Sequence, residues 1–288
     1  MKLALRMLAL AAVLFVLMGL AAVVSGVSRT AATATAASTP TVMAVAAPLV
    51  SCVLTAAVLS WLIVRSALSG ARLLGAVFLA CFGLGTFMLQ IESIVFLPRQ
   101  LPPGFVSRLF AMGALIALFA APAAAWLHGR FRPSPVAGTR PAGIPSTPAG
   151  WALRLAGLSA AYVALYFLAG YFIAYRNPDV VAYYGDTDAG SFPAAMQRVW
   201  THMPWLFALQ ALRGALWVAC VLPFILSFRG RTWELPLMIG AALSVWLVLL
   251  LAPNPYMPES VRMSHLGETA SSNFVFGCIV GAAFARAR

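Results

Sequence analysis

The chain of 288 residues is 62% apolar and only 9% charged, whereas soluble domains are about 45–50% apolar and about 25% charged. This composition excludes a nucleic-acid enzyme, a disulfide-stapled scaffold and a disordered chain. A net charge of +12 on a soluble domain would suggest nucleic-acid binding. Basic residues at helix ends also set membrane orientation, however, and the sequence indicates an integral membrane protein.

Eight apolar stretches are each long enough for a transmembrane helix, which needs about 20 residues. They run over residues 3–27, 43–66, 72–97, 105–127, 151–175, 204–228, 233–252 and 262–284, and the last is the least apolar. The first could instead be a cleaved signal peptide, but its apolar run is longer than a signal core. The predicted fold class is an all-α, polytopic integral membrane bundle of eight transmembrane helices.

The basic residues predict the orientation of these helices. With the N-terminus inside, 12 of the 19 Lys and Arg residues fall on the cytoplasmic side, 6 fall outside, and Arg213 lies within a span. This agrees with the positive-inside rule and places both termini in the cytoplasm. Because Arg and Ala are abundant and Lys2 is the single lysine, we expect a multi-pass protein of a bacterial inner membrane, surrounded by the lipid bilayer.

A Pro-, Gly- and Arg-rich segment, residues 128–150, is predicted to be a cytoplasmic linker without packed structure. It divides the chain into two halves of four spans each, residues 1–127 and 151–288. Each half has a Pro-containing outer loop before its last span, which suggests a 4+4 internal repeat of the kind found in transporters. Any two Ala-rich membrane helices look alike, however, so chance similarity is the alternative.

The outer loops carry further predictions. Residues 25–40 are expected to be exposed and mobile, and residues 192–202 to form a short helix at the membrane interface. Asp186 and Asp188 lie in a Gly-Asp-Thr-Asp-Ala-Gly sequence that starts like a calcium loop. It lacks the later ligands that such a loop requires, so a solvated turn is predicted.

Four ionisable residues stand out inside the predicted spans, where a charge near the helix centre costs at least about 2.5–3.5 kcal/mol and therefore suggests a function. They are Glu92, Arg213, His265 and Glu268. At a rise of 1.5 Å per residue they lie about 4.5–12 Å from the outer ends of their helices. Three separate spans are thus expected to bring charges to one layer in the extracytoplasmic half.

Helical periodicity groups these residues further. His265, Glu268 and Ser272 share one helix face, and Gln210 and Arg213 share another. The candidates for binding or proton coupling are Glu92, Arg213, His265, Glu268 and Gln210, with Arg262 at the mouth of the site.

The chemistry available to this cluster is limited. Arg213 could pair with Glu92 or Glu268, and His265 could hold a proton or a ligand. The sequence has one His-x-x-Glu pair, and a nearby Arg would oppose a cation, so neither a metal nor another cofactor is predicted. A buried ion-pair network that only fixes helix register is the non-functional alternative.

The remaining polar features are weaker. Tyr162 and Tyr166 could line a pocket but are interpreted mainly as packing residues, and His128 and His202 as solvated residues at span ends. The cysteines are interpreted as small buried apolar side chains; they are Cys52, Cys81, Cys220 and Cys278.

Three functions fit these residues. The first is a small-molecule permease with an outward-facing polar site, in which Glu92, Glu268 or His265 carries protons. The second is an intramembrane enzyme that acts on a lipid-linked substrate at the outer leaflet, with His265 as general base. The third is a non-catalytic membrane scaffold. The sequence leaves open which of these is correct, and hence whether the protein is an enzyme.

Overall fold

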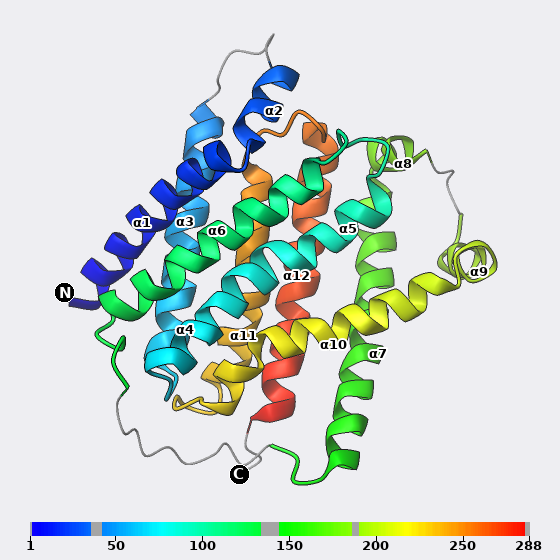
Figure 1. The fold of residues 1–288 in the computed structure, drawn as a ribbon. Helices are drawn as coiled ribbons and strands as arrows, with labels where there is room; N and C mark the ends of the chain where they lie inside the picture. Colours follow the sequence, from blue (N-terminus) through cyan, green and yellow to red (C-terminus); the bar gives the residue numbers. More distant parts are fainter. Residues whose placement is uncertain (1, 36–41, 134–143, 186–189, 286–288) are drawn as a thin grey trace.

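The computed structural model describes residues 2–35, 42–133, 144–185 and 190–285. Within these ranges all regular elements are helices (Figure 1). In the described part of the chain, seven helices are long and apolar enough to cross a membrane, as expected of a multi-pass helical membrane protein. They are Lys2–Val24, Val42–Val64, Gly70–Phe96, Phe105–Leu127, Pro148–Arg176, Trp205–Leu226 and Glu234–Leu251.

The helical elements are joined by connections of very different lengths, the longest of which is residues 128–147. In chain order they are α1 (Lys2–Val24), α2 (Val27–Thr35), α3 (Val42–Val64), α4 (Gly70–Phe78), η1 (Leu79–Phe87), α5 (Met88–Phe96), α6 (Phe105–Leu127), α7 (Pro148–Phe172), η2 (Ala174–Arg176), α8 (Pro178–Tyr184), α9 (Phe192–His202), α10 (Trp205–Leu226), α11 (Glu234–Ser244), η3 (Val245–Leu251) and α12 (Glu259–Phe284).

Three of the apolar helices change geometry along their length, and the Pro148–Arg176 helix does so where it ends in the 3-10 segment η2. The Gly70–Phe96 helix passes through the π-helical segment η1, and the Glu234–Leu251 helix ends in the 3-10 segment η3. Helix α12 has 26 residues, which at 1.5 Å per residue gives about 39 Å. It is long enough to span a membrane but is not among the seven apolar helices.

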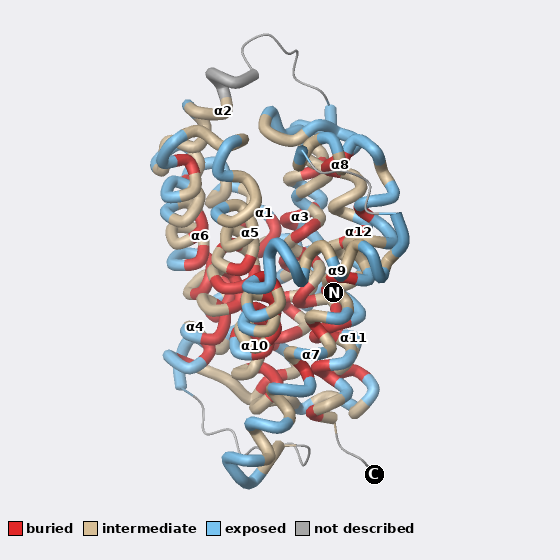
Figure 2. Tube along the Cα trace, turned by 90° about the vertical axis from the view of Figure 1, so that its right-hand side faces the viewer, coloured by how far each residue is buried: buried red, intermediate tan, exposed pale blue. Residues whose placement is uncertain are grey.

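Helices α11 and α12 pack closely because small residues line their contact. A Cβ atom at Gly277 would lie 2.6 Å from the Cα of Gly240, and one at Gly281 would lie 2.5 Å from the Cα of Pro236. Only glycine lets the two backbones approach so closely, as in other membrane helix pairs. Figure 2 shows the buried residues concentrated in the middle of the bundle.

Local sequence signals explain where several helices begin. The side chain of Thr147 accepts a hydrogen bond from the backbone N–H of Gly150 at the start of α7, and Ser191 accepts one from Ala194 in α9. Helix α9 covers the residues for which an interfacial helix was predicted. The prediction for residues 25–40 was wrong in part, because Val27–Thr35 form a helix; residues 36–41, like Asp186 and Asp188, lie outside the described ranges.

The connections at the ends of α3, α6 and α10 are joined to one another. Ser66 and Phe228 form an isolated antiparallel bridge, and Arg130 donates a 2.6 Å hydrogen bond to the carbonyl of Ser66. The guanidinium of Arg65 pairs with the carboxylate of Glu234 at 2.6 Å. Three connections far apart in the sequence therefore form one bonded layer at this end of the bundle.

His128 at the end of α6 lies beside this layer and was wrongly predicted to be solvated. It is only 6% exposed, and its Nδ1 donates to the carbonyl of Ala124 at 2.8 Å. Burial lowers the pKa of His128 below its ordinary value, and the nearby guanidinium groups of Arg6 and Arg130 lower it further.

The four cysteines are free thiols, and the prediction that they are buried holds for three of them. Cys52, Cys81 and Cys220 are buried, and Cys278 is half-buried.

Candidate functional site

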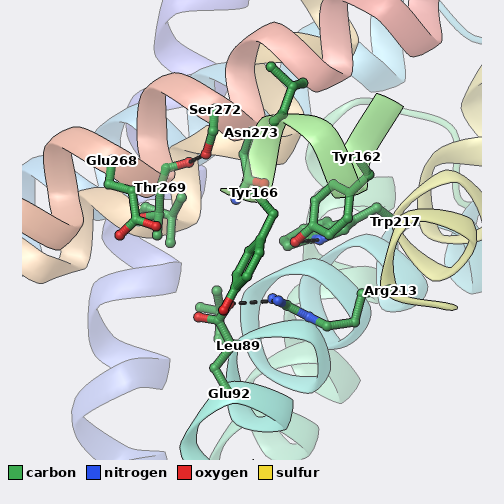
Figure 3. A pocket seen from close by; sticks show the side chains of 12 residues that line it. Leu89, Glu92, Tyr162, Tyr166, Arg213, Trp217, Glu268, Thr269, Ser272 and Asn273 are labelled. Atoms are coloured by element: carbon green, nitrogen blue, oxygen red, sulfur yellow. Dashed lines mark hydrogen bonds and ion pairs between the residues drawn. The ribbon is translucent and has the colours of Figure 1, made fainter. Parts of the chain in front are cut away.

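A small polar cavity lies where five of the helical elements meet (Figure 3). Its wall combines carboxylate, guanidinium, hydroxyl and aromatic groups from α5, α7, α10, η3 and α12. The lining residues are Leu89, Glu92, Tyr162, Leu165, Tyr166, Arg213, Trp217, Leu247, Glu268, Thr269, Ser272 and Asn273. The cavity volume is about 20 Å³, which is room for one water molecule. A solute could therefore enter only if the surrounding helices moved.

The first charged unit of this cavity is an ion pair between α10 and α5. Arg213 donates from Nη1 to the carboxylate of Glu92 at 2.6 Å and to the side-chain oxygen of Gln210 at 2.8 Å. The guanidinium also lies 5.7 Å from the centroid of the Tyr162 ring, within the range of a cation–π contact. Arg213 is therefore held on three sides, and Gln210 positions it without lining the cavity.

The second unit is a hydrogen-bonded chain from α8 to α12. His265 contacts the carboxylate of Glu268 through Nδ1 at 2.8 Å and the hydroxyl of Tyr184 through Nε2 at 3.0 Å. Of these three residues, Glu268 alone lines the cavity, and it is 7% exposed. The imidazole of His265 therefore lies between the hydroxyl of Tyr184, whose ring also contacts it, and the carboxylate of Glu268. This arrangement can pass a proton in either direction.

Aromatic residues of α7 separate the two units. Trp217 donates from its indole nitrogen to the hydroxyl of Tyr162 at 3.0 Å, and in Figure 3 the ring of Tyr166 extends toward the Glu92–Arg213 pair. The sequence favoured packing roles for Tyr162 and Tyr166 over a place in a pocket wall, but both line the cavity.

Thr269, Ser272 and Asn273 continue the polar wall along α12. Helical periodicity predicted that Ser272 shares the helix face of Glu268 one turn away, and both residues line the cavity. Tyr184 gave no comparable signal, because it lies on the short helix α8, 81 residues before His265.

Arg262 does not stand at the mouth of the site. It is buried, and its Nη1 donates to the carbonyls of Leu250 and Ala252 at 2.8 and 2.7 Å. These carbonyls lie at the end of η3, where a helix leaves acceptors without internal partners. The role of Arg262 in the structure is therefore to cap η3.

In the described ranges no three His, Cys, Asp or Glu side chains are close enough together to hold a metal ion. The trio of Glu92, His265 and Glu268 therefore does not form a ligand set in this conformation.

Comparisons with models of protein families, with curated proteins and with solved structures found no match to the chain.

Proposed function

We propose that the protein is a proton-coupled permease for a small molecule and that Glu268 carries the coupled proton. The observation that supports this best is the shared position of Glu268. Its carboxylate faces the cavity and also ends the chain of hydrogen bonds that runs through His265 to Tyr184. A proton from the α8 side of the bundle has a bonded route to the cavity wall along these three groups.

The charge balance of the site supports a coupled proton. The positive charge of Arg213 compensates the negative charge of Glu92. Among the described residues, the ion-pair partner of Glu268 is His265, which compensates its negative charge when the imidazole is protonated. A carboxylate buried to this degree is costly unless it is paired or protonated. One proton, on either His265 or Glu268, therefore brings the summed charge of these two residues and the Arg213–Glu92 pair to zero.

Two irregular helices beside the cavity support a site that opens. Leu247 of η3 lines the cavity, and Glu92 follows η1 by five residues. A Cβ atom at Gly85 of η1 would lie 2.6 Å from Trp246 of η3, so the two segments touch. Interrupted helices that meet at the binding site are typical of secondary transporters, and π-helical segments often occur at functional sites.

The proposal includes a topology of eight spans with both termini in the cytoplasm of a bacterial cell, so that the cavity lies in the outer half of an inner membrane. Helix α12 is the eighth span, and four of its polar residues line the cavity, namely Glu268, Thr269, Ser272 and Asn273. The irregular η1 and η3 both fall in the third span of their half of the chain, which supports the proposed 4+4 repeat.

The decisive experiment uses purified protein in liposomes that contain a pH-sensitive dye. Carboxylate, phosphate and amine solutes are added in turn under an inward proton gradient. We expect one class to acidify the lumen through the wild-type protein and not through Glu268→Gln. Glu259→Gln is the matched control, because Glu259 is an exposed carboxylate at the start of the same helix. Acidification through Glu268→Gln at the wild-type rate would contradict the proposal.

The enzyme hypothesis remains the second candidate because His265 lies between a hydroxyl and a carboxylate. A nucleophile, a base and an orienting acid have this arrangement in many hydrolases and transferases. Mass spectrometry of phospholipids and lipoproteins incubated with the protein distinguishes the two functions. A product that forms with wild type and not with Tyr184→Phe would favour the enzyme.

The scaffold hypothesis predicts a third outcome. In that case Glu268→Gln and Tyr184→Phe would alter stability alone, and neither proton movement nor product would be seen with the folded wild-type protein.

A further inference from the structure

A second cavity, unrelated to the polar site, opens on the outside of α7. It is a shallow groove of about 560 Å³ between α7, α9 and α10, and apolar side chains line it throughout. We call it the α7–α10 groove. Its lining residues are Ala160, Val163, Ala164, Phe167, Leu168, Phe192, Met196 and Phe207.

The position of the groove along α7 corresponds to one leaflet of a bilayer. The α7 residues that line the groove run from Leu168 back to Ala160. Their distance from Arg176, measured along the helix axis, is about 12–24 Å. A bilayer with its headgroup regions is about 40–45 Å thick, so its midplane lies about 20–22 Å from either surface. The groove therefore reaches from beneath the headgroups to about the midplane on the Arg176 side.

A positive charge stands at the surface end of this groove. The guanidinium of Arg176 lies 4.9 Å from the centroid of the Tyr171 ring and 5.7 Å from that of Phe172. Phe172 stacks in turn on Phe192, which lines the groove, with a centroid distance of 5.6 Å. Arg176 is itself exposed, so its guanidinium is accessible at the surface end of the groove.

Helix α9 is held where it can form one wall of the groove. The hydroxyl of Tyr171 donates to the carbonyl of Gly190 at 2.5 Å, just before α9 begins, and Phe192 also contacts the Tyr171 ring. No residue of α9 is fully buried. The helix therefore adds little to the core of the bundle, and its apolar side chains Phe192 and Met196 turn to the groove.

We propose that the α7–α10 groove binds one anionic phospholipid of the surrounding leaflet, with an acyl chain in the groove and the phosphate on Arg176. The apolar wall suits a hydrocarbon chain, and a guanidinium matches a phosphate in charge and hydrogen-bonding geometry. Charge complementarity at the surface end distinguishes this site from the ordinary lipid-facing surface of the bundle. The proposal is independent of the permease function.

Lipid retention tests the proposal. Protein in lipid nanodiscs of mixed phosphatidylglycerol and phosphatidylcholine is released into the gas phase, and the lipids that remain bound are identified by mass. We expect about a fivefold preference for phosphatidylglycerol, the effect of one Arg near an anionic lipid. Arg176→Gln should abolish that preference, whereas Arg99→Gln, an exposed Arg in the connection after α5, should leave it unchanged.

Filling the groove tests the position of the acyl chain. Ala164→Trp should remove the retained lipid, and Ala152→Trp should not, because Ala152 is an exposed alanine of α7 outside the groove. Equal retention in both variants, or a phosphatidylglycerol preference that survives Arg176→Gln, would overturn the proposal.

A measurement on the wild-type protein covers the case in which Ala164→Trp does not fold. Phosphatidylglycerol with a photoreactive group on its acyl chain should label peptides from α7, α9 and α10. Labelling spread evenly over all lipid-facing helices would overturn the proposal.

Discussion

The ion pair between Arg213 and Glu92 joins two side chains of very different exposure. The side chain of Arg213 is 3% exposed, whereas that of Glu92 is 33% exposed, and their atoms approach to 2.6 Å. When one partner of a buried pair is removed, the remaining charge loses its compensation, and the cost rises with the burial of that charge. The two partners are therefore not equivalent.

Neutralising each partner in turn should reveal this asymmetry. Glu92→Gln leaves a buried guanidinium unpaired and should lower the free energy of unfolding by about 3 kcal/mol. Arg213→Gln leaves the more exposed carboxylate and should cost about 1–2 kcal/mol. Denaturant unfolding in detergent micelles measures both. The double variant should be more stable than Glu92→Gln alone, and equal losses in the two single variants would contradict the argument.

The contact between η1 and η3 leads to a second prediction. Gly85→Ala would place a Cβ atom 2.6 Å from Trp246, and overpacking of this kind typically costs about 1–3 kcal/mol. Gly75→Ala is the control in the same span, because a Cβ atom there meets nothing within 4 Å; it should leave stability unchanged or raise it slightly. Thermal unfolding of the two variants checks this, and equal melting temperatures would show that η1 and η3 move apart freely.

The sequence predicted the helical class and the apolar spans because length and hydropathy suffice to recognise a membrane helix. It also selected Glu92, Arg213 and Glu268, which the structure places around one cavity. Charges are scarce inside spans and therefore stand out. The sequence left open whether Arg213 pairs with Glu92 or with Glu268, because that choice depends on how three helices pack.

The sequence could not predict features that depend on distant contacts. Tyr184 reaches His265 across 81 residues, and nothing near Tyr184 marks it. Arg262 shares the helix face of His265, yet its side chain extends to the carbonyls of Leu250 and Ala252. Helical periodicity gives the face on which a residue lies, but a long side chain can reach a neighbouring helix end.

Arg262 gives a third prediction. Arg262→Met removes the two hydrogen bonds from the buried guanidinium to the end of η3, and bonds of this kind contribute about 1.5–3 kcal/mol. We expect unfolding free energy to fall by about 3 kcal/mol, while proton movement through the folded fraction keeps its wild-type rate. Arg108→Met is the control: this exposed Arg also donates to a carbonyl, that of Gly26, and its loss should cost less than about 1 kcal/mol. A transport defect in folded Arg262→Met would contradict the capping role.

His128 provides a prediction about pH. In the neutral ring Nδ1 donates to the carbonyl of Ala124, and the buried Nε2 has no hydrogen-bond partner among the residues that the structure describes. Burial lowers the pKa of His128, so the unfolded chain takes up a proton at a higher pH than the folded protein does. The neutral folded state is thus favoured fully above about pH 6.5, and stability falls as the pH drops below it, by at most about 1.4 kcal/mol per unit.

Replacing His128 should therefore reduce the acid sensitivity of the fold. His128→Asn retains a donor for the carbonyl of Ala124 and cannot titrate, so its melting temperature should fall less than that of wild type between about pH 7.5 and about pH 5.5. His202→Asn is the matched control, because the exposed His202 makes the same contact with the carbonyl four residues before it, that of Arg198. If His128→Asn and His202→Asn lose stability in parallel with wild type, acid sensitivity comes from groups other than His128.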